Sequence, residues 1–340
     1  MKHVFRVSSH LTFFLSKKYI EVKGLNLDDC IIFLVRDYHI PTKYDAMFKH
    51  QIHTSYNVSQ TVGRVFAGAN IFKTRQNIAE FDGLVDPYIN GDSFIWYAQI
   101  CNDDFCSLMV TKKNCVGYYV IEDGLGSYIP KNPQTFEGWR YWMYKFLLKP
   151  LWPRIFEVKN NFIYTDSPKF KGCIATSQKC FPLHQQYLEV MEAPFEKQEL
   201  DVVPEAVVSI DPLYLYMDDV TVKKVYNDLG RYIAQKNYKT VHYKYHPYLN
   251  SKANASIKAD YKKLIDEMFG DKGIELSADV VLENHFCTHK CDFYTNRSSV
   301  AVYASNMGST CYSYSPIIQK YKSDYTEFSI VDEYCTPIVI

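Results

Sequence analysis

Short runs of apolar, β-branched and aromatic residues alternate along this chain with longer segments of helical periodicity. This alternation restricts the fold more than any other feature, because it is typical of βα units and a mostly parallel sheet. In the first half it predicts strands at residues 3–7, 30–35, 94–99, 117–121 and 162–165, with helices at 11–22 and 136–148. In the second half it predicts strands at 206–210, 240–245, 274–276, 292–295 and 311–315, with helices at 219–235, 257–269 and 300–305.

A run without periodicity separates the two series. Residues 191–204 contain four acidic residues and two prolines, which is typical of a linker between domains. We therefore expect an α/β protein with two Rossmann-like domains, 1–190 and 205–315, that face each other across a cleft. For the C-terminal tail, 316–340, packing back on the first domain is one option.

Composition narrows the class of protein. The chain has 340 residues, and its 38 basic residues balance its 38 acidic ones, so net charge does not favour nucleic acid as a partner. No apolar stretch approaches the ~18 residues that a membrane-spanning helix needs. We also recognise no signal peptide, and the ten cysteines are too sparse for a disulfide-stapled fold. We expect a cytoplasmic protein, with peripheral contact at the inner face of a membrane left open.

Two carboxylates follow the predicted strand 117–121. Glu122 and Asp123 stand directly before Gly124, which allows a sharp turn. Adjacent carboxylates tend to differ in pKa, which suits one of them to act as a general base. A purely structural acidic turn at the end of a strand would have the same Glu-Asp-Gly sequence, so a structural role remains an alternative to catalysis.

Polar residues also follow two strands of the second half. His246 precedes Pro247, which confines it to an extended backbone at the end of a strand, where its imidazole could protonate a phosphate oxygen. Ser298 and Ser299 lie between a strand and a helix, where hydroxyls and backbone N–H groups can bind phosphate. A structural histidine and an ordinary helix cap are the simpler alternatives.

The segment 121–128, the pair His246 and Pro247, and the pair Ser298 and Ser299 resemble motifs of bacterial sialyltransferases. The lipooligosaccharide sialyltransferases and the capsular polysialyltransferases are the most similar branches. The order of the motifs and their distribution over the two halves match, over about two thirds of the chain.

The resemblance implies a fold of the GT-B type and an inverting, metal-independent transfer of sialic acid from CMP-sialic acid to a sugar hydroxyl. It implies that Asp123 or Glu122 is the general base that deprotonates the acceptor hydroxyl. It implies that His246 interacts with the phosphate that leaves with CMP. Ser298 and Ser299 would be phosphate ligands. It implies no cofactor beyond the donor substrate, and a galactoside-terminated surface glycan as acceptor. A homodimer is a further option.

Three other groups of residues have competing interpretations. Asp219, in the pair 218–219, is an alternative base, although helix capping explains the pair as well. Ser9 and His10, after the first strand, are placed with Gly124 on the acceptor side, and a helix N-cap explains them equally. The pattern H-x-C-x-H-x-C at 285–291 has zinc-ligand residue types, but on a strand its ends would lie roughly 20 Å apart, so we expect no metal.

Two alternatives to sialyl transfer remain. A phosphate site and a base do not identify the donated sugar, so a related transferase that uses another activated sugar, such as CMP-Kdo, fits the same residues. A non-catalytic glycan-binding protein of the same fold also fits.

Overall fold

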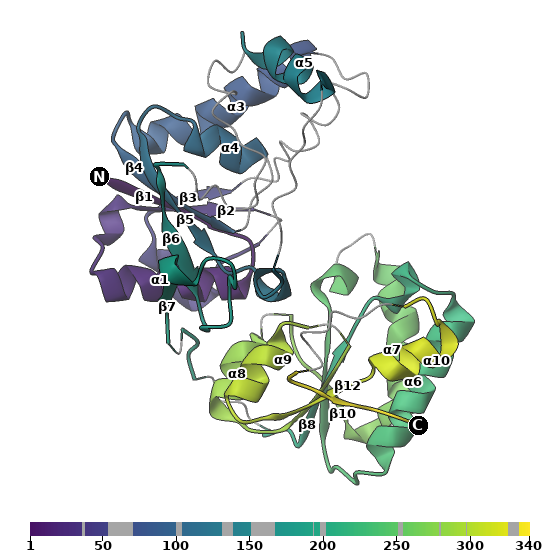
Figure 1. The fold of residues 1–340 in the computed structure, drawn as a ribbon. Coiled ribbons are helices and arrows are strands. Elements are labelled where there is room, and N and C mark those ends of the chain that lie inside the picture. The colour runs from purple at the N-terminus through teal and green to yellow at the C-terminus, as the bar shows by residue number, and fades with distance from the viewer. Residues whose placement is uncertain are drawn as a thin grey trace. The chain divides into compact units, whose positions relative to one another are not determined.

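The computed structural model describes residues 1–35, 38–53, 71–99, 104–130, 139–150, 167–192, 194–197, 202–250, 254–278, 280–296, 298–325 and 333–340. The chain divides into two compact units, Met1–Pro194 and Phe195–Ile340 (Figure 1). This division falls inside the segment that we expected to be the linker.

The described strands of the first unit form a seven-stranded parallel sheet, which we call sheet A. Its order is β3-β2-β1-β4-β5-β6-β7. The strands are β1 Lys2–Val7, β2 Cys30–Leu34, β3 His50–His53, β4 Phe94–Gln99, β5 Cys115–Ile121, β6 Phe170–Ala175 and β7 Leu188–Val190. All five residues of β2 are buried, which explains its uninterrupted apolar sequence: a parallel strand is covered on both faces.

Helices cover both faces of sheet A. They are α1 His10–Lys23, α3 Ile71–Ile89 and α4 Asp104–Val110, and the unit also contains helix α5 Trp139–Leu148. Helix α1 lies on one side of the sheet, and α3 and α4 lie on the other (Figure 1). Helix α1 begins at a capping box between Ser9 and Thr12 and ends at Gly24, whose φ of 59° suits a glycine.

The second unit contains a six-stranded parallel sheet, sheet B, of order β10-β9-β8-β11-β12-β13. Its strands are β8 Ala206–Ile210, β9 Val241–Tyr245, β10 Gly273–Glu275, β11 Asp292–Thr295, β12 Thr310–Ser313 and β13 Thr336–Pro337. Its helices are α6 Asp219–Ala234, α7 Ala255–Phe269, α8 Leu282–Thr288, α9 Val300–Asn306 and α10 Ser315–Tyr321. Helices α6, α7 and α10 lie on one side of sheet B, and α8 and α9 lie on the other (Figure 1).

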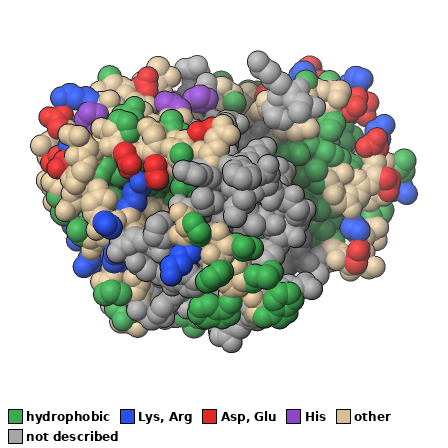
Figure 2. All heavy atoms as spheres, turned by 90° about the horizontal axis from the view of Figure 1, so that it is seen from above, with side chains coloured by type: hydrophobic (Ala, Val, Ile, Leu, Met, Phe, Trp, Pro, Cys, Tyr) green, Lys and Arg blue, Asp and Glu red, His purple; other side chains and the backbone are tan. Residues whose placement is uncertain are grey.

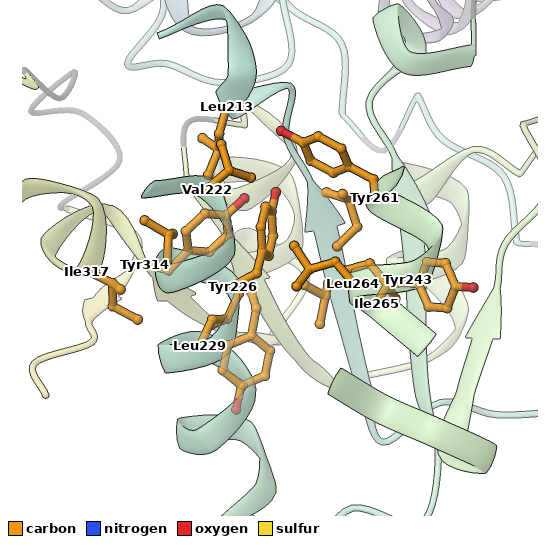
Figure 3. Close-up of a cluster of buried hydrophobic side chains, with 14 of the residues drawn as sticks. Leu213, Val222, Tyr226, Leu229, Tyr243, Tyr261, Leu264, Ile265, Tyr314 and Ile317 are labelled. Atoms are coloured by element: carbon orange, nitrogen blue, oxygen red, sulfur yellow. The ribbon is translucent and has the colours of Figure 1, made fainter. Parts of the chain in front are cut away.

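The core of the second unit lies between sheet B and the helices α6, α7 and α10. Figure 3 shows Tyr226, Tyr261 and Tyr314 among the aliphatic side chains of this core. Leu229 and Ile265 are completely buried there, and burying one such side chain contributes about 1.5–3 kcal/mol. The chain has 29 tyrosines, and those in this core serve packing.

The fold class predicted from the sequence is confirmed: two α/β units of Rossmann type, each with a parallel sheet. The cleft between them stays a prediction, because the structure describes each unit by itself. Four of the described strands, β3, β6, β7 and β13, lie where we expected none. The predicted strand at 162–165 lies outside the described residues.

The C-terminal segment needs a correction. Its described parts, 316–325 and 333–340, belong to the second unit rather than to the first. Helix α10 packs in the core beside α6, and β13 pairs with β12 in sheet B. Burial of Ile317, Ile318 and Ile338 in this core accounts for that placement.

Candidate active site

Sheet B has a point at which its strand order reverses. From β8 the chain moves to β9 and β10 on one side, and it then returns to β11, β12 and β13 on the other. Ligands of open parallel sheets bind outside the carboxyl ends of the strands at such a point. The residues that follow β8, β9 and β11 are therefore the first candidates for a site in this unit.

Asp211 follows β8, and it was missed in the sequence. It is buried, its Oδ2 accepts a hydrogen bond from the Tyr314 hydroxyl at 2.8 Å, and it also accepts one from the backbone N–H of Asn296, which follows β11. Burial raises the pKa of Asp211, while the Tyr314 hydrogen bond and the charge of His246 oppose that rise. The signal that could have identified it is an acidic residue between a β-branched strand and Pro212.

His246 lies beside Asp211 at the same edge. Ile210 and Tyr245 are paired in the parallel register, and the backbone N–H of His246 donates to the carbonyl of Ile210 at 2.9 Å. The imidazole is exposed, and its Nδ1 accepts a hydrogen bond from the backbone N–H of Tyr248 at 3.2 Å. That bond leaves Nε2 as the nitrogen that carries the proton in the neutral ring.

Ser298 and Ser299 lie at the start of α9, just after β11 and therefore at the same reversal point. Ser298 Oγ accepts a hydrogen bond from the backbone N–H of Val300 at 3.2 Å, so this hydroxyl contributes to the helix start. Ser299 is the N-cap residue, and within the described start of α9 its side chain makes no capping bond. Both serines are half-buried. Their role as phosphate ligands stays a prediction.

In the first unit, Glu122 and Asp123 follow β5 as expected but differ in environment. Glu122 is completely buried, and its Oε2 accepts hydrogen bonds from the backbone N–H and the hydroxyl of Thr176, at 2.7 and 2.8 Å. Glu122 thus joins the end of β5 to the end of β6. Its charge also adds to burial in raising the pKa of Tyr128.

Asp123 is half-buried, and its backbone N–H donates to Ser127 Oγ at 3.0 Å. Gly124 follows with a φ of 74° and begins the short 3₁₀ turn Gly124–Ser127, which is the sharp turn that the sequence predicts. Of the two carboxylates, Asp123 is the better candidate for a base, because Glu122 is occupied by Thr176.

The predicted acceptor-side residues Ser9 and His10 follow β1. The Ser9 hydroxyl accepts the backbone N–H of Thr12 in the capping box, so the simpler interpretation accounts for its side chain. His10 Nδ1 shares a hydrogen bond with the hydroxyl of Tyr38, which follows β2, at a distance of 2.9 Å. These two residues therefore organise the carboxyl edge of sheet A near β1.

The alternative base, Asp219, is the first residue of α6, and its side chain is exposed. Asp218 before it is the N-cap, and its carboxylate accepts hydrogen bonds from the backbone N–H and the hydroxyl of Thr221, both at 2.9 Å. The capping bonds lower the pKa of Asp218. Capping explains Asp218, whereas a role for Asp219 stays a prediction.

The H-x-C-x-H-x-C segment is not a strand, so the separation estimated for a strand does not apply to it. His285 and Cys287 lie on α8, and His289 and Cys291 follow it. The rings of His285 and His289 are 5.3 Å apart between centroids. Across the described parts of the chain, no group of three or more His, Cys, Asp or Glu residues could hold a metal ion.

No family model and no curated protein matches this chain. Solved structures do resemble its fold. UDP-GlcNAc 2-epimerase from Methanocaldococcus jannaschii has a TM-score of 0.52 at 12% identity, over 100% of this chain and 89% of the other. S. aureus MnaA, in a co-structure with UDP, has a TM-score of 0.52 at 11% identity, over 92% and 79%. A putative UDP-N-acetylglucosamine 2-epimerase from Listeria monocytogenes also scores 0.52, at 10% identity, over 92% and 78%.

The chain has a GT-B type of fold. At these identities the comparisons establish the fold alone, and the chemistry has to be inferred from the side chains.

Proposed function

We propose that this chain is a glycosyltransferase whose donor is a nucleotide-activated sugar bound at the carboxyl edge of sheet B. The observation that carries the proposal is the convergence of His246, Asp211 and Ser298 at the ends of three adjacent strands, at the reversal point of the sheet. A hydroxyl, a helix start and an imidazole that holds a proton on Nε2 are suited to a diphosphate or a phosphodiester.

The chemistry that we propose is an inverting displacement. The base, Asp123 or alternatively Asp219, takes the proton of the acceptor hydroxyl as its oxygen bonds to the anomeric carbon. The bond from that carbon to the donor phosphate breaks at the same time. His246, neutral and protonated on Nε2, donates a hydrogen bond to the departing phosphate oxygen and stabilises the negative charge that develops there, and the buried side chain of Asp211 lies beside it.

For the donor we propose CMP-sialic acid, and for the acceptor a galactoside-terminated surface glycan. The support for this choice is the resemblance of the motifs at 121–128, His246–Pro247 and Ser298–Ser299 to those of bacterial sialyltransferases. The proposed reaction requires no metal, because the imidazole, hydroxyls and backbone N–H groups can offset the phosphate charge. CMP-Kdo is the alternative donor that uses the same residues.

A UDP-sugar epimerase is the second candidate function. It is favoured by the fold, which resembles two proteins described as UDP-GlcNAc 2-epimerases and a protein in a co-structure with UDP. The two functions differ in their second substrate, because an epimerase needs no acceptor hydroxyl to release or invert its sugar.

The deciding experiment incubates the chain separately with CMP-sialic acid, CMP-Kdo and UDP-GlcNAc, each with and without an array of galactosides. We expect acceptor-dependent release of CMP from CMP-sialic acid. The variant His246→Ala should lose this turnover, whereas His53→Ala, which changes an exposed histidine of the first unit, should keep it. Inversion at C2 of UDP-GlcNAc without an acceptor, seen by NMR, would replace the proposal with the epimerase.

The same variant distinguishes an enzyme from a non-catalytic glycan-binding protein. A binding protein would release no nucleotide from any donor, and His246→Ala would leave its affinity for the glycan unchanged.

A further inference from the structure

Helix α5 in the first unit carries exposed apolar side chains. Trp139 is 69% exposed, Trp142 60% and Phe146 70%, and Met143 and Leu147 are also exposed. Their spacing of three and four residues places all five on one stripe of the helix. We call this stripe the α5 face. Figure 2 looks onto the side of the first unit where α5 lies in Figure 1, and hydrophobic side chains gather in its lower centre.

The α5 face differs from an ordinary surface. Single exposed apolar residues are common, but a contiguous group that includes two tryptophans and a phenylalanine marks a contact with another surface. Burying such side chains against the first unit would have been favourable, so their exposure needs a separate explanation.

The charge around α5 identifies the kind of surface. The sequence from 139 to 154 contains Arg140, Lys145, Lys149 and Arg154 and no acidic residue. Exposed tryptophan beside a run of basic residues that lacks acidic ones is the composition that binds the interface of an anionic bilayer, because aromatic rings partition to the level of the headgroups and cations are attracted to anionic lipids.

We propose that the α5 face docks this protein on the surface of an anionic phospholipid membrane. A second copy of the chain is a poorer partner, because a symmetric contact through α5 would bring two sets of basic residues together without an acidic complement. The cores of protein interfaces are also depleted in lysine.

Docking of this kind leaves the helix in the plane of the interface. Helix α5 has ten residues and is about 15 Å long, half of the ~30 Å that a spanning helix has to cross. Among the described helices none is long and apolar enough to cross a bilayer. The docking holds whichever sugar nucleotide the chain uses, since it involves a helix separate from sheet B.

The test is co-sedimentation of the full chain with vesicles of phosphatidylcholine alone and of phosphatidylcholine with phosphatidylglycerol. We expect binding to the anionic vesicles only, weakened at least tenfold between low salt and 0.5 M salt, with a blue shift of tryptophan fluorescence. The double variant Phe146→Ser with Leu147→Ser should reduce binding at least tenfold. The matched control is Val22→Ser, which removes an exposed apolar side chain from α1 of the same unit and should bind as the wild type does.

Each other outcome overturns the proposal. Absence of binding to anionic vesicles excludes the membrane as partner, and unchanged binding by the double variant places the contact elsewhere. A change from dimer to monomer in the double variant, seen by sedimentation velocity in the absence of vesicles, would assign the α5 face to contact between copies of the chain. Because the experiment measures membrane binding, its result tests the docking proposal independently of whether the chain transfers a sugar.

Discussion

His285 should make the second unit sensitive to acid. Its side chain on α8 is completely buried, and neither ring nitrogen has a hydrogen-bond partner among the described residues. Burial, together with repulsion from His289 and His242, lowers the pKa of His285 from 6.5 to about 4. The ring is therefore neutral in the folded chain at neutral pH.

The size of the effect follows from the two pKa values. Because the pKa is lower in the folded than in the unfolded chain, the stability that the neutral ring contributes is present above pH 6.5. It is lost as the pH falls toward 4. The full difference corresponds to about 3 kcal/mol, of which about 2 kcal/mol is already lost at pH 5.

The assay is hydrogen exchange in urea at pH 7.5 and pH 5, read by mass spectrometry on peptides that cover β9 and α8. The variant His285→Phe keeps an aromatic ring but does not titrate. Between the two pH values we expect it to lose about 2 kcal/mol less unfolding free energy than the wild type loses. The control His53→Gln, an exposed histidine, should follow the wild type. A variant His285→Phe that loses as much stability as the wild type would refute the reasoning.

Four further predictions concern the candidate site. Asp123→Asn and His246→Ala should each lower kcat by roughly 10²–10⁴-fold with little change in melting temperature, and near-normal transfer by both would contradict their roles. Chelators should leave activity intact, and a requirement for added Mg²⁺ or Mn²⁺ would refute a metal-independent reaction. The double variant Ser298→Ala with Ser299→Ala should weaken CMP binding, measured by calorimetry, by on the order of 1 kcal/mol per lost contact, and it should also slow turnover. Wild-type affinity and turnover would show that the serines only cap the helix. Because burial raises the pKa of Asp211, its ionisation opposes folding as pH rises through that pKa. In urea unfolding the stability of Asp211→Asn relative to the wild type should therefore increase as the pH is raised through the range in which Asp211 ionises, while turnover falls.

Much of the fold could be predicted because it is encoded locally. Strands β8 and β11 and helix α6 lie within one residue of their predicted bounds, since each is a run of a single periodicity that ends at a turn or cap residue. Strand β7 has three residues, all half-buried, which is too short for any periodicity to appear. The segment around His285 contains alternating His and Cys that imitate a strand, but packing of α8 against α9 made it a helix.

The site was predictable only in part for a different reason. His246 and Ser298 could be identified because each directly follows a recognisable strand. Asp211 also follows a strand, but its importance depends on Tyr314, about a hundred residues later, and on Asn296, which follows the neighbouring strand. Contacts of that kind are set by strand order, and strand order in a parallel sheet cannot be derived from the periodicity of its strands.

Adjacent polar residues at the ends of strands and the starts of helices divide their work in this fold. In two pairs at helix starts one side chain is bonded to nearby backbone and fixes the turn, while its neighbour, exposed or half-buried, is the candidate for contact with a ligand. The pairs, with the anchoring residue first, are Asp218 and Asp219, and Ser298 and Ser299. The reason is steric, because consecutive side chains leave the backbone in different directions and only one can reach the N–H groups of the following turn. A pair of like residues at such a position therefore predicts one anchor and one candidate for chemistry, and the first variant to make at each pair is the second residue.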